Sequence, residues 1–331
     1  MKNILVTGGA GFIGSEFVRQ TAGKDYKVTV LDSLTYAGDL QRLAEVKDKI
    51  TFIKGDICDQ EVIRSLFSGN RFDIIAHFAA ESHVDRSILD SSVFVDTNIK
   101  GTNNLLDAAK KSGIEKFLYV STDEVYGHLG EDGQFFETTS FAPNSPYSAS
   151  KASADLLVRA FHKTHALPVL TVRPSNNYGP WQYPEKLIPV IIYKAMKGEK
   201  IPVYGSGMNV REWLYTNDCV SGIFSVIEKG RIGEAYNIGS GNERRNIEVV
   251  KTVLGIMGKS EDLIEYVSDR PGHDFRYSLN TDKIRGELGW KPEVSFSKGM
   301  EMTTNWYLAN MDWVEEKVRY LGDYWERIYR K

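Results

Sequence analysis

Cysteine is scarce in this sequence. Its 331 residues include two, Cys58 and Cys219, which lie far apart and show no metal-ligand spacing. Such usage excludes a disulfide framework and favours a reducing compartment. The six histidines form no HExxH motif and no Cys/His cluster, so the sequence predicts no metal site.

Long apolar runs and a strong excess of one charge are also missing. No apolar run approaches the roughly 20 residues of a membrane span, and the first strand-like run begins at Asn3, so we expect neither a membrane segment nor a signal peptide. A net charge of -3 gives no general attraction to nucleic acid or to an anionic membrane. The sequence therefore indicates a cytoplasmic protein in which a few placed cations or backbone N–H groups bind any anionic ligand.

Apolar runs of strand length alternate with helical segments as far as Pro174. The runs are residues 3–7, 27–31, 51–54, 73–76, 116–121 and 169–173, and the helical segments include 14–21, 60–67, 92–111 and 147–165. The interiors of the runs are almost continuously apolar, as in strands that are covered on both faces. This alternation predicts an α/β fold with a Rossmann-type doubly wound parallel sheet.

The pattern changes beyond Pro174, where prolines punctuate loops and the elements become shorter and mixed. We expect residues 1–175 to form the doubly wound domain, with later segments returning to it. Residues 176–331 would form mainly a smaller, mixed α/β domain. Its aromatic-rich tail from Ser297 to Tyr329 is predicted to be helical.

A glycine run, Gly8, Gly11 and Gly14, lies between the first strand and the first helix. Glycines there permit a tight turn and close approach of a pyrophosphate, to which the helix N-terminus offers N–H groups. A plain tight turn would be the simpler interpretation of an isolated run. Asp32 follows at the end of the second strand, at about the spacing of a dinucleotide-binding fingerprint, and therefore favours a dinucleotide.

Asp32 also indicates which dinucleotide binds. A carboxylate accepts hydrogen bonds from ribose hydroxyls and repels a 2′-phosphate, and Ser33, Leu34, Thr35 and Tyr36 include no cation to offset that repulsion. The sequence therefore predicts NAD rather than NADP. Asp56 and Ile57 are placed to flank the adenine, although a plain turn would also explain them. The predicted NAD-binding residues of this region are Gly8, Gly11, Phe12, Ile13, Gly14, Asp32, Ser33, Leu34, Thr35, Asp56 and Ile57.

Tyr147 and Lys151 share one face of a predicted helix, four residues apart. A nearby ammonium stabilises a phenolate, so we expect Lys151 to lower the pKa of Tyr147. The tyrosine could then take a proton from a sugar hydroxyl while hydride leaves the same carbon. Such a pair is frequent by chance on helices; it becomes informative here because it follows the NAD fingerprint.

Thr122, Asp123 and Glu124 follow a predicted strand at its carboxyl end, the edge where open α/β sheets bind ligands. Thr122 can hydrogen-bond the reacting hydroxyl. Asp123 and Glu124 place an acid beside a base, as an elimination requires. A solvated acidic pair in a loop is the alternative interpretation.

The sequence resembles dTDP-glucose 4,6-dehydratases, of the extended short-chain dehydrogenase/reductase family, over nearly its whole length. The resemblance is carried by the glycine run, by residues 77–87 (HFAAESHVDRS), by 121–127 (STDEVYG) and by the Tyr147/Lys151 pair. It continues in residues 176–180 (NNYGP), 184–189 (PEKLIP), 209–213 (NVREW) and 269–274 (DRPGHD). The Thr-Asp-Glu triplet is the most specific feature. Related epimerases usually have small neutral residues at the two acidic positions, and related decarboxylases keep Glu but replace Asp by Ser.

The resemblance implies NAD as cofactor and a nucleotide sugar, dTDP-glucose, as substrate. It assigns catalysis to Thr122, Asp123, Glu124, Tyr147 and Lys151. It adds to the NAD site Phe78, Ala79, Ala80, Ser82, Thr97, Tyr147, Lys151 and Asn177. The implied substrate-binding residues are Ser82, Thr122, Asn176, Lys186, Leu187, Pro202, Tyr204, Arg211, Asn246, Arg270 and His273. His83, by contrast, is interpreted as a structural histidine.

The resemblance further implies a homodimer formed through a four-helix contact. The segments 92–111 and 151–165 carry the apolar side chains Val93, Phe94, Val95, Ile99, Leu105, Leu106, Leu156, Leu157, Val158 and Phe161. Packing of all of them on the sheet is the alternative. Two other functions also stay open: a UDP-sugar epimerase or decarboxylase of the same fold, and a non-catalytic protein that senses NAD.

Overall fold

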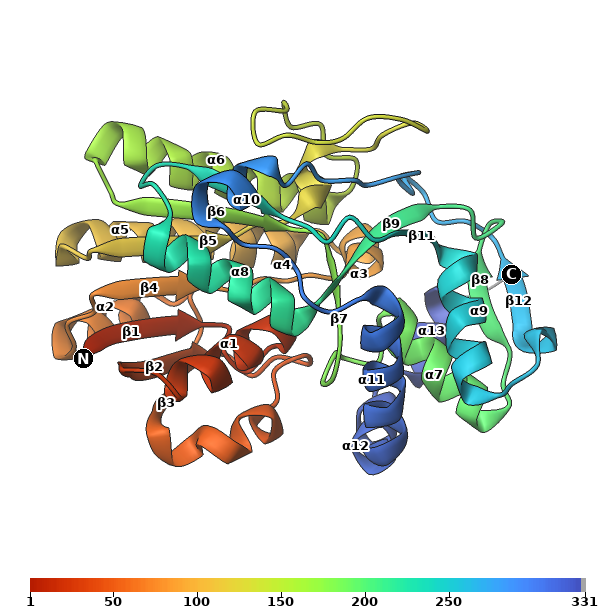
Figure 1. Ribbon diagram of the computed structural model, residues 1–331. Helices are drawn as coiled ribbons and strands as arrows, with labels where there is room; N and C mark the ends of the chain where they lie inside the picture. The colour runs from red at the N-terminus through yellow and green to blue at the C-terminus, as the bar shows by residue number, and fades with distance from the viewer. Residues whose placement is uncertain (329–331) are drawn as a thin grey trace.

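A seven-stranded parallel sheet forms the larger part of the computed structural model, which describes residues 1–328 (Figure 1). The strand order is β10-β6-β5-β4-β1-β2-β3. The strands are β1 (Lys2–Thr7), β2 (Tyr26–Asp32), β3 (Ile50–Lys54), β4 (Ile74–His77), β5 (Lys116–Val120), β6 (Val169–Pro174) and β10 (Ala235–Ile238). The predicted α/β class and doubly wound sheet are confirmed, and each predicted strand lies within one residue of its expected ends.

Helices cover both faces of this sheet. Successive side chains of a strand point to opposite faces, so each apolar strand contributes to two cores. Ile4 and Val6 of β1 join one apolar core, and Leu5 between them joins another. The first core is completed by α1 (Phe12–Ala22), α8 (Thr216–Lys229) and α10 (Asp282–Leu288), and the second by α2 (Gln60–Gly69), α5 (Thr102–Ser112) and α6 (Pro146–His165). Strand β10 and helices α8 and α10 thus come from beyond residue 175.

The predicted helix at 92–111 is one helical rod with an irregular middle. It runs through α4 (Ser92–Phe94), the π-helical segment η2 (Val95–Gly101) and α5. Within η2 the side chain of Asn98 is buried, accepts from Glu81 N at 2.9 Å and donates to Glu81 O at 3.0 Å. It also donates to Ser150 Oγ at 2.8 Å. The π-helical turn therefore ties the loop after β4 to α6, the helix of Tyr147 and Lys151.

A smaller lobe stands beyond the carboxyl edge of the large sheet (Figure 1). Its two small sheets have the strand orders β11-β9-β7 and β12-β8. The strands are β7 (Asn176–Tyr178), β8 (Ile201–Tyr204), β9 (Val210–Tyr215), β11 (Glu243–Arg245) and β12 (Ile264–Val267). The lobe's helices are α7 (Leu187–Lys197), α9 (Asn246–Met257), α11 (Phe296–Ala309), α12 (Met311–Val318) and α13 (Gly322–Ile328). The short segments of the chain are η1 (Leu40–Lys49), α3 (Val84–Leu89), η3 (Asp123–Tyr126) and η4 (Glu261–Leu263).

The predicted helical tail is helical from Phe296 onward, but as three separate helices. α11 ends at Ala309 and α12 begins at Met311, while α13 follows a break at residues 319–321. Trp306, Tyr307 and Trp313 of the tail pack into the apolar core of the small lobe. Tyr329, the expected end of the tail, and residues 330–331 lie outside the described residues.

A buried ion pair fixes the middle of α6 against the large sheet. Arg173 of β6 donates from Nε and Nη2 to the two oxygens of Asp155, at 2.9 and 3.0 Å. Both side chains are buried. Asp155 lies on the same helical face as Tyr147 and Lys151, at successive spacings of four residues. The pair therefore sets the rotation of the helix that carries them.

Replacing Asp155→Ala is expected to lower the free energy of unfolding by about 3–5 kcal/mol, because the Arg173 charge would stay buried without its partner. Glu61→Ala is the matched control, since it breaks the exposed ion pair with Arg64 and should cost about 0–1 kcal/mol. Urea denaturation of the two variants measures the difference. Equal decreases in the free energy of unfolding would show that the buried ion pair stabilises the protein no more than the exposed one.

Candidate functional site

The turn between β1 and α1 is formed by glycines that leave no room for a side chain. A Cβ on Gly8 would stand 2.5 Å from Ala79 N, and one on Gly14 would stand 2.2 Å from Gly8 O. Gly8 also has a positive φ of 71°. Helix α1 begins at Phe12 with Gly11 as its N-cap, no side-chain cap and no acidic residue in its first turn. Its first N–H groups are therefore available to a phosphate.

Asp32 faces this turn from the end of β2. Its Oδ2 accepts from Ala10 N at 2.9 Å, and its Oδ1 accepts from Leu34 N at 2.8 Å. Burial raises the pKa of Asp32, and these two backbone donors act against the rise. Each Asp32 carboxylate oxygen is held by one backbone N–H and has further lone pairs that can accept hydrogen bonds from ribose hydroxyls. A dinucleotide-binding site requires such an acceptor at the end of the second strand.

A cavity of about 310 Å³ runs from the glycine turn to the helix of Tyr147. The predicted cofactor residues that line it are Gly8, Gly11, Phe12, Ile13, Gly14, Asp32, Ser33, Thr35, Asp56, Ile57, Phe78, Ala79, Ala80, Ser82, Thr97, Tyr147, Lys151 and Asn177. Leu34 is the exception, because its backbone has a positive φ of 55° and its N–H is turned to Asp32. Its assignment to the NAD site stays a prediction, and its N–H contact places it directly beside Asp32 of the lining.

Tyr147 and Lys151 reach the far end of this cavity from the first turns of α6. Lys151 Nζ donates to Val120 O at 2.7 Å, and burial lowers the pKa of Lys151 to about 7. Burial and the Glu124 carboxylate raise the pKa of Tyr147, while a hydrogen bond with Thr122 acts in the opposite direction. The expectation that Lys151 lowers the pKa of Tyr147 is therefore not met by the protein alone. Burial outweighs any effect of the ammonium.

Asp123 and Glu124 are not a solvated pair. The Asp123 side chain is 1% exposed, Thr122 Oγ1 donates to its Oδ1 at 3.2 Å, and its buried Oδ2 has no hydrogen-bond partner among residues 1–328. Burial, followed by repulsion from Glu124 and Glu212, raises the pKa of Asp123 well above its ordinary value. Asp123 is therefore suited to carry a proton at neutral pH.

Glu124 meets the opposite electrostatic surroundings. Burial raises the pKa of Glu124 above its ordinary value, and the nearby charges of Arg270, Arg211 and Lys186 limit that rise. Ser148 Oγ donates to Glu124 Oε2 at 3.2 Å. Two adjacent carboxyl groups are thus placed in different environments, which is the arrangement of an acid beside a base.

A second cavity, of about 170 Å³, lies between the sheet edge and the small lobe. Ser82, Glu124, Asn176, Asn177 and Lys186 line both cavities. The predicted substrate residues in the second cavity are Ser82, Asn176, Lys186, Leu187, Pro202, Tyr204, Arg211, Asn246, Arg270 and His273, whereas Thr122 lines the first. The two cavities therefore meet beside Glu124.

Three cations border this second cavity. Lys186 Nζ donates to Ser82 O at 2.8 Å, Arg211 Nη2 donates to Asp274 O at 2.9 Å, and Arg270 Nη1 donates to Asp85 Oδ1 at 3.1 Å. Arg270 Nε is buried and has no partner among the described residues. Burial and the neighbouring guanidinium charges lower the pKa of His273 to about 4. The second cavity thus presents three cationic donors, which suit a diphosphate. The imidazole of His273 beside them is neutral at pH 7.

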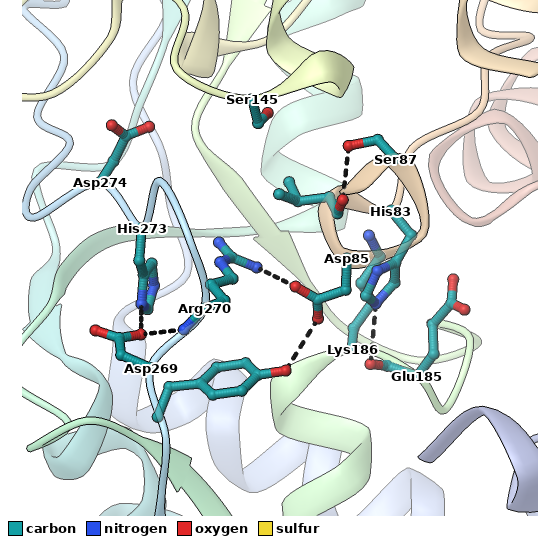
Figure 2. Close-up of polar contacts among 12 residues, drawn as sticks. His83, Asp85, Ser87, Ser145, Glu185, Lys186, Asp269, Arg270, His273 and Asp274 are labelled. Carbon is teal, nitrogen blue, oxygen red and sulfur yellow. Dashed lines mark hydrogen bonds and ion pairs between the residues drawn. The ribbon is translucent and has the colours of Figure 1, made fainter. Parts of the chain in front are cut away.

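Sequence reasoning missed the anionic partners of these groups (Figure 2). Asp85 accepts from Arg270 and, at 3.3 Å, from Tyr204 Oη, so it orients a cation and an aromatic ring of the cavity. Glu185 accepts from Tyr36 Oη at 3.0 Å and from Arg86 Nε at 2.9 Å. Both acids lie within motifs of the family resemblance, but a sequence does not show which cations such acids pair with.

Arg42 was missed as well, although it lines the first cavity. Arg42 lies on η1, beyond the four residues that follow Asp32 in the sequence. It donates through Nη1 to Ala10 O at 2.8 Å and through Nε to Trp181 O at 3.1 Å. Burial lowers its pKa to about 10, and it stays a cation at neutral pH.

Two further observations concern metals and membranes. Within residues 1–328, no group of three or more His, Cys, Asp or Glu side chains could hold a metal ion. No helix in the same range has the length and apolar character needed to cross a membrane.

Comparison with known proteins identifies the family. A model of the family described as GDP-mannose 4,6 dehydratase matches residues 5–303. The dTDP-glucose 4,6-dehydratase of Xanthomonas campestris pv. campestris (strain B100) is 50% identical, with 95% of this chain and 95% of that protein covered. The chain belongs to the dTDP-glucose 4,6-dehydratase family.

Solved structures separate this family from its epimerase neighbours. The dTDP-glucose 4,6-dehydratase of Streptomyces venezuelae, crystallised with NAD bound, has a TM-score of 0.92 and 47% identity over 95% of this chain and 99% of that chain. A UDP-glucose 4-epimerase of Thermotoga maritima has a TM-score of 0.88 but 31% identity, over 93% of this chain and 99% of that chain. The fold is common to both activities, and the higher identity lies with the dehydratase.

In this member of the dehydratase family, Asp32→Ala should weaken NAD binding about 10²- to 10⁴-fold, since two hydrogen bonds from ribose hydroxyls to a charged group would be lost. The preference for NAD over NADP should narrow, because the repulsion of a 2′-phosphate disappears. Titration calorimetry with both dinucleotides measures this. Asp25→Ala, at the exposed partner of the N-terminal amine, is the control. A native protein that binds NADP as tightly as NAD would contradict the assignment of Asp32.

Proposed function

We propose that this chain is an NAD-dependent dTDP-glucose 4,6-dehydratase, a hydro-lyase that forms dTDP-4-keto-6-deoxyglucose. The observation that carries the proposal is the buried Asp123 carboxyl beside Glu124, where the two cavities meet. Removal of water needs a proton donor for the leaving hydroxyl and a base for the neighbouring carbon. A 4-epimerase has no leaving group for Asp123 to protonate, and a protein that only senses NAD has no use for either group.

The residues of the first cavity fit NAD. The glycine turn and the N-terminus of α1 would hold the pyrophosphate, Asp32 the adenosine ribose, and Tyr147 and Lys151 the nicotinamide end. Bound NAD would supply a reversible two-electron oxidation, used first at C4 of the glucose and reversed at C6. The cycle is redox-neutral, so the cofactor can remain bound.

Tyr147 is the proposed base of the oxidation. Its hydroxyl would accept the O4 proton as C4 becomes a ketone. Because burial raises the pKa of Tyr147, the phenolate needs positive charge nearby when it forms. Lys151 has one Nζ hydrogen bond to Val120 O, which leaves its other N–H donors for the cofactor ribose and the phenolate. The Thr122 hydroxyl would hold the same sugar oxygen.

Glu124 and Asp123 are the proposed base and acid of the elimination. A ketone at C4 acidifies the C5–H bond, and Glu124 would take that proton, helped by the cations that oppose its protonation. Asp123, whose pKa is raised by burial, would give its proton to the C6 hydroxyl, which leaves as water. Reduction at C6 and return of the proton to C5 complete the product.

The second cavity is the proposed nucleotide site. Lys186, Arg211 and Arg270 would form charge-assisted bonds to the diphosphate, and Tyr204 offers an aromatic face to the base. The thymidine nucleotide is supported by the names of the relatives, which are dTDP-glucose 4,6-dehydratases. We place the enzyme in the cytoplasm, where the free thiols of Cys58 and Cys219 stay reduced.

A homodimer is the proposed assembly. Of the apolar side chains on the helices 92–111 and 151–165, Phe94, Leu105, Leu106 and Val158 are buried within the protomer. Val95 is 51% exposed and Leu156 is 53% exposed. Exposed apolar side chains on two neighbouring helices support a two-fold contact between those helices and their copies.

Light scattering should therefore give the mass of a dimer at micromolar protein, and Leu156→Glu should shift it towards a monomer because a charge would be buried at the contact. Ile232→Glu, at an exposed position in the turn between α8 and β10, is the control and should leave the mass unchanged. A native mass equal to one chain rules out this assembly.

The division of labour between Tyr147 and the acidic pair is testable by single turnover. Glu124→Gln should still oxidise C4, so absorbance of reduced nicotinamide should accumulate, while dehydration slows on the order of 10²–10⁴-fold. Tyr147→Phe should suppress oxidation and dehydration together and give no such signal. A Glu124→Gln enzyme that dehydrates at the native rate would show that Glu124 is not the base of the elimination.

Isotope transfer distinguishes the proposed reaction from its rivals in the same assay. Deuterium placed at C4 of the glucose should be found at C6 of the product. A 4-epimerase would return it to C4, and a decarboxylase would lose C6. Retention at C4 would leave the NAD site intact and overturn the dehydratase assignment.

A further inference from the structure

A helix near the end of the chain lies against the loop that would surround the adenosine ribose. This ribose loop, residues 33–39, follows β2 and includes Ser33 and Thr35 of the first cavity. Its last residue, Asp39, contacts α12, although Trp313 of that helix lies 274 positions further along the chain. In Figure 1, α12 lies at the lower edge of the small lobe, on the side towards β2 and β3.

The glycine turn is held through the peptide groups of Ala10. The Ala10 N–H donates to Asp32 Oδ2 at 2.9 Å. The Ala10 carbonyl accepts from Asp39 N at 3.0 Å and from Arg42 Nη1 at 2.8 Å. Arg42 Nη1 also donates to Ala37 O at 2.5 Å. Asp39 and Arg42 thus bind the ribose loop to the turn that would receive the pyrophosphate.

Helix α12 in turn holds Asp39 and Arg42. Trp313 Nε1 donates to Asp39 Oδ2 at 2.7 Å, and Lys317 Nζ lies 3.0 Å from the same oxygen. The Trp313 ring covers the Arg42 guanidinium, 5.6 Å from its centroid. Burial acts to raise the pKa of Asp39, but the donors Trp313, Gln41 N and Lys317 hold it below its ordinary value. A charged carboxylate is therefore kept in place behind the cofactor cavity.

We propose that Trp313 and Lys317 are positioning residues for the cofactor, which act through Asp39 and Arg42 to keep the ribose loop closed and NAD bound between turnovers. The inference rests on the proposed function, because that reaction returns hydrogen to the same sugar and cannot lose its cofactor midway. A loop that is already ordered binds its ligand at a lower entropic cost, and loosening it mainly raises the dissociation rate. Neither Trp313 nor Lys317 lines the cavity, so both act from behind it.

The test measures release of NAD from the loaded, full-length protein after mixing with excess of a fluorescent etheno analogue of NAD. Trp313→Phe keeps an aromatic side chain at this position and removes the Nε1 donor with the pyrrole part of the indole, so release should be on the order of tenfold faster. Lys317→Met should also speed release, and Lys317→Arg should restore the native rate. With NAD saturating, kcat and the KM for the nucleotide sugar should stay native in all three.

Two variants serve as matched controls. Trp290 is 6% exposed, as Trp313 is, and donates its Nε1–H to Ser221 Oγ at 2.8 Å, but it packs in the core of the large sheet. Lys283 pairs with Glu234 at 2.7 Å. Trp290→Phe and Lys283→Met should cost similar stability and leave NAD release at the native rate.

The outcomes separate this inference from the function on which it rests. Equal release rates in Trp313→Phe and Trp290→Phe would overturn the positioning role and leave the dehydratase assignment untouched. A Trp313→Phe enzyme whose kcat stays low at saturating NAD would also overturn it, since the damage would then be general. A wild-type protein that neither retains nor uses NAD would overturn the proposed function itself.

Discussion

The backbone contact between Gly14 and Gly8 is the constraint on which the rest of the site depends. A side chain at Gly14 would stand 2.2 Å from the Gly8 carbonyl oxygen, so α1 can leave β1 at this angle only because both residues are glycine. That angle aims the N-terminus of α1 at the cofactor cavity and turns the Ala10 peptide towards Asp32. The loops after β2 and β4 then close around the turn, since Gly8 also packs directly on the backbone of Ala79. The cofactor cavity is thus bounded by backbone before any side chain is considered.

Exclusion of water is the second constraint, and it acts on the catalytic groups in opposite directions. Burial raises the pKa of Asp123, which favours the protonated acid, and lowers the pKa of Lys151 to about 7. For Glu124 the same burial is opposed by three cations of the second cavity. The groups that would bind the diphosphate therefore also set the charge of the proposed base. For Tyr147, burial works against the reaction, and the cost has to be offset by positive charge that arrives with the cofactor.

The features that the sequence predicted well are formed by residues close together in the chain. The glycine turn, the strand ends and the acids of η3 are read from residues that are neighbours in the chain, and their geometry follows from strand–turn–helix rules. Tyr147 and Lys151 were predicted because four residues make one helical turn. The direction of the pKa of Tyr147 was not, since it depends on how completely α6 and η3 exclude water around it. The assignment of Leu34 to the NAD site rests on adjacency in the sequence, whereas its positive φ is a feature that only the fold shows.

Contacts between distant segments account for the rest. Arg270 and Asp85 are 185 positions apart, and Asp39 and Trp313 are 274 apart. No spacing rule connects such pairs, and their side chains, a basic or aromatic residue and an acid, are common on any surface. The small lobe brings them together because β10, α8 and α10 return to the large sheet and carry the intervening segments past its carboxyl edge (Figure 1). The proposed proton-transfer groups, by contrast, all lie within residues 122–151, at η3 and on α6. Proton transfer tolerates little error in distance, and these groups lie on two elements that contact each other, whereas binding can be shared among many loops.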